Sequence, residues 1–357
     1  MSAAVTIDSA KSEAFAQSLL EVLNHSGLAL MISLGHRTGL FDVLARLEAA
    51  TCQDIALAAE LNERYVREWL GAMVTGGVVD YSAEEQTYRL PAEHAAWLTR
   101  AAVPNNMAAT MQWFSVLGGV EDLVCEAFRH GRGVPYAAYN RFHEVMAEES
   151  AQTVVAGLRQ HILPLVNGLL EQLESGIEVM DVGCGAGRAM NYLASQFPKS
   201  RFLGRDFSTE AIEQARRQAH SMGVANVTFE AVDVAEMNDT ARFDLITAFD
   251  AIHDQVRPQR VLDNIHRALK PSGVFLMQDI AGSGHAHTDG RYPLATLGYA
   301  ISCMHCMSVS LAGGGPGLGA MWGKQKALEM LAKAGFKDVV VESLDHDILN
   351  YYYVCRP

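Results

Sequence analysis

Basic residues are scarce in this chain of 357 residues, because 28 lysines and arginines stand against 41 acidic residues and give a formal net charge of -13. An acidic surface repels phosphate backbones, so the composition argues against nucleic acid as the main partner. Hydrophobic residues make up 49% of the chain, which is enough to bury a sizeable core and excludes wholesale disorder. A chain of this length favours two or three domains.

The sequence also lacks the usual marks of export or membrane insertion. It opens with M-S-A-A-V-T-I-D-S-A, in which no basic stretch precedes an apolar run, so we expect no signal peptide. Glycine, histidine or charge interrupts the apolar stretches before about 20 residues, so we expect no membrane span. The six cysteines are scattered apart from one close pair, which favours reduced thiols. We therefore expect a cytoplasmic protein.

Three regions differ in pattern, and we expect domains over residues 1–103, 104–170 and 171–357. The first has helical patterns, then V-V-D-Y at 78–81, a polar turn, and T-Y-R-L at 87–90, which together outline a winged helix-turn-helix. The second region is helical and aromatic and is interpreted as a linker or lid. From residue 176 onward, strands, glycine-rich turns and helices alternate, which predicts an α/β sheet domain.

A winged helix raises the possibility of DNA binding. Between residues 41 and 100 there are five basic and ten acidic residues. A recognition helix that carries Glu60, Glu63 and Glu68 would present negative charges to the DNA phosphates, which repel them. We therefore favour a module for contacts within a homodimer, and a transcription regulator with a ligand-sensing second domain remains the alternative.

A glycine-rich turn marks the start of the third region. The strand at 177–182 leads into Asp181-Val-Gly-Cys-Gly-Ala-Gly187, in which Gly183, Gly185 and Gly187 would let a ligand approach the backbone closely. The dinucleotide fingerprint G-x-G-x-x-G needs glycine at position 188, where this chain has Arg188. A nicotinamide oxidoreductase is therefore disfavoured.

Acidic residues end the strands that follow, at 201–206, 226–232 and 243–249. Asp206 comes after Gly183 at close to the spacing of about 20 residues that suits an acid binding a ribose diol. Asp233 and Asp250 follow the next two strands. Each of these acids alone could equally be a helix N-cap. Together they would meet at the carboxyl edge of an open α/β sheet, where such sheets bind ligands.

The block from 176 to 280 resembles the class I, Rossmann-like S-adenosylmethionine-dependent methyltransferases. The matching segments are D-V-G-C-G-A-G, G-R-D-F-S, E-A-V-D-V, F-D-L-I and L-K-P-S-G-V. The resemblance implies S-adenosylmethionine as cofactor and S-adenosylhomocysteine as product. It also implies a seven-stranded sheet, closed by an antiparallel hairpin from 335–344 and 348–355, behind a mainly helical winged-helix domain.

The resemblance also assigns cofactor contacts. In that family the glycine turn holds the methionine part, the acid after the second strand binds the ribose, and the acid after the third meets the adenine amino group. The cofactor residues implied here are Asp181, Gly183, Gly185, Gly187, Asp206, Phe207, Asp233, Val234 and Asp250.

The segment F-D-A-I-H-D-Q places His253 and Asp254 at the carboxyl edge of the strand at 243–249. This pair resembles the His-Asp pair of plant-type O-methyltransferases, which also carry a winged-helix dimerisation domain and in which that histidine deprotonates the acceptor hydroxyl. The following Gln255-Val-Arg-Pro departs from their usual Trp-Ser-Asp, so the acceptor stays open. His253 is a candidate general base. Contact with the cofactor, or helix capping, is the alternative role.

A second candidate base is His305 in S-C-M-H-C-M-S at 302–308. Cys303 and Cys306 form a C-x-x-C that could serve redox or metal chemistry, but two ligands are too few for structural zinc, so no metal site is expected. On an α-helix the two cysteines would share a face and His305 would point away. We interpret the segment as a helix lined with polarizable methionine and cysteine side chains, which packs on the sheet or on the acceptor pocket.

The acceptor pocket has further candidates. The glycine run at 311–323 reads as a flexible loop, and it resembles a bacterial branch of winged-helix methyltransferases in which C-M-H-C-M and this run recur. Aromatic and methionine residues of the middle region could be core or pocket, and the plant-type resemblance places Phe142 and Met146 in a lid that excludes water. The candidate pocket residues are Trp113, Phe142, Met146, Met304 and Trp322. The sequence therefore predicts methyl transfer to a small-molecule hydroxyl or thiol.

Overall fold

The computed structural model describes residues 7–357 and divides into two compact units, which meet between Ser115 and Val116. Residues 104–115 belong to the first unit, and residues 116–170 belong to the second. The three-domain division drawn from the sequence stays a prediction. The expectation about a signal peptide concerns in part residues 1–6, which lie outside the described residues.

The first unit is a helical domain with a two-stranded wing. The short helix α3 (Cys52–Ala58) begins with a capping box, in which the Thr51 and Asp54 side chains each accept from the other's backbone N–H. Helix α4 (Glu63–Thr75) follows, and its Trp69 and Leu70 are buried against Phe41 in the core. The wing is a hairpin of β1 (Asp80–Ser82) and β2 (Thr87–Arg89). The other helices are α1 (Ser9–Thr38), α2 (Leu40–Leu44), α5 (Ala92–Leu98), α6 (Met107–Thr110) and the start of α7 (Trp113–Gly118).

Helix α1 exposes apolar side chains over much of its length. Phe15 is 65% exposed and Leu23 is 69% exposed, and Leu19, Leu20 and Leu34 are also exposed. By length and hydropathy alone, α1 could cross a membrane, and so could the helical segment Ala295–Ala312. Buried helices of folded domains and signal sequences meet the same criterion, so these two segments are weak evidence for a membrane protein.

The second unit contains the predicted seven-stranded sheet. Its strand order is β5-β4-β3-β6-β7-β9-β8, in which the first five strands are parallel and β9 is antiparallel to both of its neighbours. The strands are β3 (Glu178–Val182), β4 (Arg201–Asp206), β5 (Val227–Ala231), β6 (Phe243–Phe249), β7 (Leu269–Ile280), β8 (Asp338–Leu344) and β9 (Asp347–Arg356). The Rossmann-like fold class is therefore confirmed, with the C-terminal hairpin closing the sheet as predicted.

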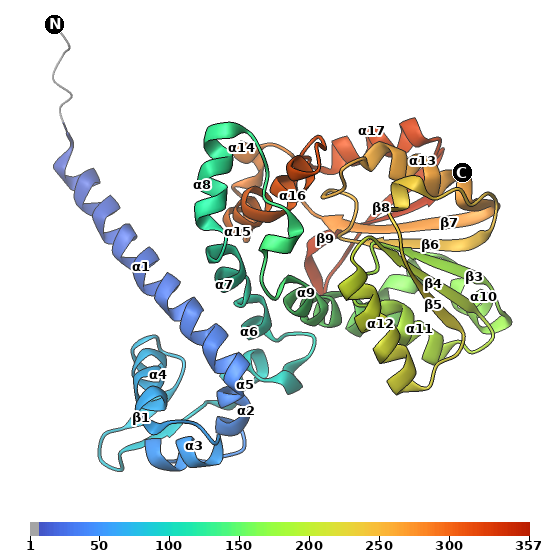
Figure 1. Cartoon of the computed structure of the whole chain (residues 1–357). Helices are drawn as coiled ribbons and strands as arrows, with labels where there is room; N and C mark the ends of the chain where they lie inside the picture. The colour runs from blue at the N-terminus through green and yellow to red at the C-terminus, as the bar shows by residue number, and fades with distance from the viewer. Residues whose placement is uncertain (1–6) are drawn as a thin grey trace, which may run out of the picture. The chain divides into compact units, whose positions relative to one another are not determined.

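Helices cover both faces of this sheet (Figure 1). On one face, α10 (Leu169–Ser175), α11 (Arg188–Gln196) and α12 (Thr209–Met222) enclose a core that includes Val179 and Leu245. On the other, α13 (Pro258–Ala268) and α17 (Lys324–Ala334) enclose a core around Ile246 and Phe275. Alternate residues of each strand point to opposite faces of the sheet. Because helices cover both faces, the central strands are apolar on both sides.

Helical segments before the sheet and between β7 and β8 carry π-helical turns. Helix α8 (Glu121–His130) and helix α9 (Phe142–Ser150) precede the π-helical turns η3 (Ala151–Val155) and η4 (Leu158–Ile162). After β7 come α14 (Ala286–Asp289), α15 (Ala295–Ile301), the π-helical turn η7 (Ser302–Cys306) and α16 (Met307–Ala312). Such turns often occur at functional sites.

The π-helical turn η7 corrects the α-helical reading of C-x-x-C. Because a π-helix turns less per residue than an α-helix, the residues that share a face change. His305 and Cys306 are both buried, and Cys303 is partly exposed. The glycine run after α16 is a loop, as predicted, but it is anchored: the Gly319 N–H donates to the His253 carbonyl, and the Gly315 N–H donates to the Ser310 carbonyl.

Candidate active site

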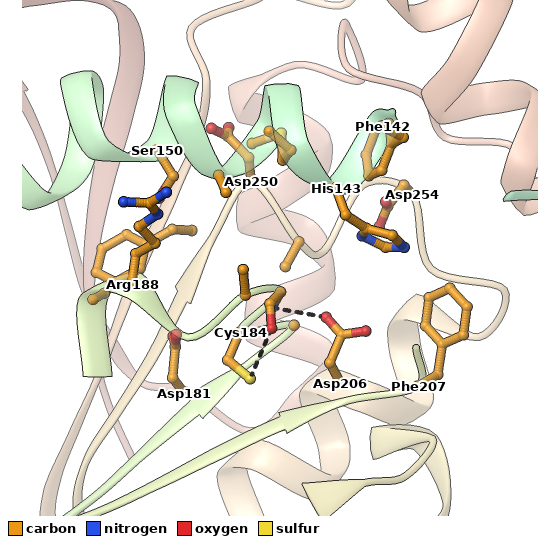
Figure 2. A pocket seen from close by; sticks show the side chains of 18 of the residues that line it. Phe142, His143, Ser150, Asp181, Cys184, Arg188, Asp206, Phe207, Asp250 and Asp254 are labelled. Carbon is orange, nitrogen blue, oxygen red and sulfur yellow. Dashed lines mark hydrogen bonds between the residues drawn. The ribbon is translucent and has the colours of Figure 1, made fainter. Parts of the chain in front are cut away.

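A cavity opens at the carboxyl edge of the sheet, beneath helix α9 (Figure 2). All but one of the predicted cofactor residues line it: Asp181, Gly183, Gly185, Asp206, Phe207, Asp233, Val234 and Asp250. Gly187 is not among the lining residues. It packs instead against the core beneath α11 and α12, where a Cβ atom at this position would lie 2.5 Å from Phe229. The parallel strands β3, β4, β5 and β6 therefore bring this sequence set to one place.

The glycine turn joins β3 to α11, and its three glycines have positive φ angles. A Cβ atom at Gly183 would lie 2.5 Å from Ala251, so the backbone packs closely there. At Gly185 a Cβ atom would meet no protein atom within 4 Å, and the residue lines the cavity. The turn therefore leaves room beside Gly185 that a ligand can fill.

Asp206 fixes the turn from the neighbouring strand. Its Oδ2 accepts from the Gly185 N–H at 2.9 Å (Figure 2). Its Oδ1 accepts from the Ser208 N–H at 2.8 Å. Burial raises the pKa of this carboxyl despite these hydrogen bonds. Asp206 therefore combines a structural role with a place in the cavity wall.

Asp233 has the helix-capping role that the sequence left open, and it also lines the cavity. Its Oδ1 accepts from the Ala235 N–H at 2.8 Å, and its Oδ2 lies 2.6 Å from the Arg257 guanidinium. Capping and ligand contact do not exclude each other, because a carboxylate can accept several hydrogen bonds.

Two more acids of the cavity have strongly raised pKa values. Burial raises the pKa of Asp181 to about 7, although Thr247 donates to it at 2.7 Å. Burial and the negative charge of Asp279 raise the pKa of Asp250 to about 8. Asp250 also has a positive φ of 50°, an uncommon backbone conformation for a residue other than glycine. Charged forms of both acids are disfavoured as long as no cation faces them.

Aromatic rings gather at the end of the cavity next to Asp254. Tyr136 lies 5.3 Å from Phe142 and 5.0 Å from Phe207, measured between ring centroids. The Tyr136 hydroxyl donates to Asp254, whose pKa burial raises to about 6. Met146, the other predicted lid residue, lines the same cavity from α9.

His253 lies outside the lining and is 3% exposed. Its Nδ1 is 2.7 Å from Asp279 Oδ1. Burial opposes a charge on His253, but Asp279 and Cys306 outweigh it and raise the pKa of the histidine well above its usual value. Asp250, His253 and Asp279 also hold one potential metal ligand each within 4.8 Å of one another.

The remaining predicted acceptor-site residues do not line the cavity. Trp322 Nε1 donates to Asp279 Oδ1 at 3.0 Å, so the indole helps to fix the position of this carboxylate. The buried His305 ring stacks on Phe142 at 4.2 Å, and burial lowers its pKa to about 3. The Met304 carbonyl accepts from the Tyr139 hydroxyl. Trp113 is buried in the first unit, so its place in the pocket stays a prediction.

Four residues of this region were missed from the sequence. Asp279 is the last residue but one of β7, so the rule that strands of this sheet end in acids could have identified it. Arg188 lines the cavity, and its buried Nε has no hydrogen-bond partner among the described residues. Tyr136 and His143 carry no local motif, because they reach the cavity only through the packing of the segment that covers it.

Comparison with known families matches both parts of the chain. Residues 26–100 match the model of an Rv2258c-like winged helix-turn-helix domain, and residues 173–335 match the model of a methyltransferase domain. Trans-aconitate 2-methyltransferase of Deinococcus radiodurans is 32% identical over 30% of this chain and 40% of its own length. The fatty-acid O-methyltransferase of Mycolicibacterium smegmatis is 28% identical over 34% of this chain and 44% of its own length. The chain thus spans less than half the length of these curated relatives.

Solved structures are similar over nearly the whole chain. Human N-acetylserotonin methyltransferase in complex with S-adenosylmethionine has a TM-score of 0.68 and 17% identity, over 99% of both chains. An O-methyltransferase family protein from Burkholderia thailandensis has a TM-score of 0.67 and 15% identity, over 96% of this chain and 97% of that one. These likenesses support the fold. The chain therefore combines a winged helix-turn-helix domain with a methyltransferase domain of the Rossmann-like fold.

Proposed function

We propose that this protein transfers a methyl group from S-adenosylmethionine to a hydroxyl or thiol of a small molecule, with His253 as general base. The observation that carries the proposal is the cavity itself, in which the open side of Gly185 faces a ring of strand-end carboxylates. Bound S-adenosylmethionine supplies a methyl group on a positively charged sulfur. The surplus of acids over bases in the cavity wall suits a positively charged ligand.

The cofactor residues would divide the ligand between them. Gly183 and Gly185 would take the methionine part against the backbone, and Asp206 would accept hydrogen bonds from the ribose hydroxyls. Asp233 would meet the adenine amino group beside Val234. Arg188, with a buried and unpartnered Nε in the cavity wall, offers a positive charge for the ligand's carboxylate.

Removal of the acceptor proton falls to the His253–Asp279 pair. Asp279 holds Nδ1 in the protonated form, which leaves the other nitrogen as the proton acceptor. An acceptor hydroxyl therefore has to reach that second nitrogen. Asp254, bonded to Tyr136, would orient the acceptor, and Phe142 with Met146 would close the cavity from α9 and exclude water.

Labelled methyl transfer to a panel of phenols, carboxylates, thiols and arsenite tests this function. We expect transfer to at least one hydroxyl or thiol compound. A carboxylate acceptor alone would contradict the role of His253, because a carboxylate carries no proton to remove at neutral pH. Screening the same panel with His253→Ala shows whether each transfer depends on the base.

A winged-helix transcription regulator is the second candidate, and the matched helix-turn-helix model is the observation in its favour. The arginines of α4 pair with glutamates of the same helix, Arg64 with Glu68 and Arg67 with Glu63. These ion pairs leave little positive charge for phosphates. Sequence-specific retention of DNA in a gel-shift assay at low salt would favour this second function.

We also propose that the protein acts as a homodimer through its first unit. The support is the row of exposed apolar side chains on α1, including Phe15, Leu19 and Leu23. Monomeric proteins rarely expose contiguous apolar patches of this kind, which usually mark interfaces. A second copy of the chain presents the same apolar helix and could cover it.

A further inference from the structure

Helix α9 presents one face to the cavity in which the proposed cofactor would lie. Phe142, Met146 and Ser150 follow one another at intervals of four residues, so they share a face of the helix, and all three line the cavity. The glycine turn at Gly185 lines the same cavity from the sheet. A ligand bound against the turn therefore lies beneath α9 (Figure 2), and movement of α9 would uncover it.

His143 joins α9 to the segment that follows β4. It is the second residue of α9 and lines the cavity, and its ring points from the helix into the cavity on the side of Asp206 and Phe207 (Figure 2). Its Nε2 lies 3.1 Å from the Ser208 Oγ, which is a hydrogen-bond distance. This contact therefore links the helix that covers the cavity to the wall that contains Asp206.

Ser208 is itself held in place, so it offers His143 a fixed partner. It is the N-cap of α12, where its Oγ accepts from the Ala211 N–H at 3.3 Å. Its own N–H donates to Asp206 Oδ1 at 2.8 Å, and Asp206 is the acid that would bind the ribose hydroxyls. A serine hydroxyl can accept two hydrogen bonds and donate one, so the bond to His143 forms beside the capping bond with either tautomer of the imidazole.

Ring contacts hold the start of α9 as well. Phe142 stacks on His305 of η7 at 4.2 Å, measured between ring centroids. Tyr136, from the segment before α9, lies 5.0 Å from Phe207, the residue next to Ser208. The hydrogen bond of His143 adds a directional link to these apolar contacts.

We propose that His143 is a positioning residue, whose hydrogen bond to Ser208 keeps α9 over the ribose end of the bound cofactor and slows its release. The inference rests on the proposed function, because it concerns the same ligand. The bond has to break before α9 moves away from Ser208, so its loss should let the ligand dissociate faster. One hydrogen bond between uncharged groups corresponds to a change of about 2- to 10-fold.

The test is the rate at which S-adenosylhomocysteine dissociates from the full chain, measured by surface plasmon resonance. We expect His143→Phe, which keeps a ring but has no nitrogen, to raise this rate about fivefold. His143→Gln, whose amide N–H can donate to the same oxygen, should stay within about twofold of the unaltered protein. His220→Phe is the matched control, because His220 is an exposed residue of α12 that does not line the cavity, and it should leave the rate unchanged.

Ser208→Ala distinguishes a contact with Ser208 from a direct contact between His143 and the ligand. Because this substitution also removes the cap of α12, the comparison is made within the Ser208→Ala background. There His143→Phe should change the dissociation rate less than about twofold, since the partner is already gone. A fivefold increase in that background would overturn the proposal, and so would an unchanged rate in His143→Phe when Ser208 is present.

Thermal unfolding without ligand shows whether each variant is folded. If His143→Phe does not fold, His143→Leu takes its place in both comparisons. A folded, unaltered protein that takes up no S-adenosylhomocysteine would overturn the proposed function together with this inference. Normal uptake with an unchanged dissociation rate in the His143 variant would overturn this inference alone.

Discussion

Asp279 gives His253 the chemistry that a buried histidine otherwise lacks. Burial alone would lower the pKa of an imidazole and leave it a poor base, as it does at His305, where the pKa falls to about 3. At His253 the adjacent carboxylate reverses the direction. Two buried histidines near the same cavity therefore differ in basicity because only one of them faces an aspartate.

Replacing His253 with glutamine should lower turnover of a phenolic acceptor about 100-fold or more, because the proton acceptor is lost. The affinity for S-adenosylhomocysteine should stay within about threefold, because His253 does not line the cavity. Steady-state kinetics and calorimetry measure the two quantities. Turnover that survives the substitution would remove His253 from the mechanism.

The raised pKa of His253 determines how kcat/KM depends on pH. A protonated imidazole cannot accept a proton, so kcat/KM should rise with pH to a midpoint above 6.5, the ordinary value for histidine. Asp279→Asn should move that midpoint to lower pH, because the negative charge that favours the imidazolium is gone. An unchanged midpoint would show that another group is titrating.

Asp250 makes the stability of the protein depend on pH as well. Its pKa of about 8 in the fold lies above the ordinary 3.8, so the folded chain holds a proton that the unfolded chain releases between these values. The contribution of Asp250 to the free energy of unfolding therefore falls as pH rises through that window. Asp250→Asn should raise Tm at pH 8.5 by about 2 °C or more relative to its effect at pH 4. Thermal unfolding at both pH values would contradict this if the two differences were equal.

Residue-level roles were only partly predictable from the sequence. The Asp206 and Asp250 positions follow from the rule that parallel strands end at one edge of a sheet. Asp279 obeys the same rule, but its role depends on His253, which folding brings against it from the end of the neighbouring strand. The cover formed by Tyr136 and Phe142 depends on packing between distant segments, which no local pattern encodes.

At the scale of elements, two glycines of the same turn have different roles: Gly187 allows close packing, and Gly185 leaves space for a ligand. Gly187→Ala places a Cβ atom 2.5 Å from Phe229 and 2.6 Å from Ala215, at a positive φ. We expect it to cost about 2–4 kcal/mol of stability. Gly185→Ala meets no protein atom, so we expect a cost of about 1 kcal/mol and at least about tenfold weaker S-adenosylhomocysteine binding.

Chemical unfolding and calorimetry on this matched pair separate the two roles. If both variants lose stability equally and the Gly185 variant binds as well as the unaltered protein, the space beside Gly185 is not the ligand site.

The elements themselves were largely predictable where local chemistry defines them. The capping box at Thr51 and the alternation of strand and helix after residue 176 both appear in the structure. The α-helical reading of residues 302–308 failed because a π-helical turn depends on tertiary packing, and helix propensity does not distinguish it from an α-helix.

On the scale of the whole molecule, exposure of α1 predicts self-association. Sedimentation velocity should find a dimer of the 38.8 kDa chain. The double variant Leu19→Glu with Leu23→Glu should shift it to monomer, because both side chains are exposed on the same face of α1. Glu21→Gln on the same helix is the matched control and should stay dimeric. A monomeric unaltered protein would contradict this prediction.

Calorimetric titration of the intact protein with S-adenosylhomocysteine tests the central claim most directly. The account predicts saturable heat with one ligand per chain, and an affinity about tenfold lower in Asp206→Asn, because hydrogen bonds to a charged carboxylate are lost. A folded protein that takes up neither S-adenosylhomocysteine nor S-adenosylmethionine would contradict the account.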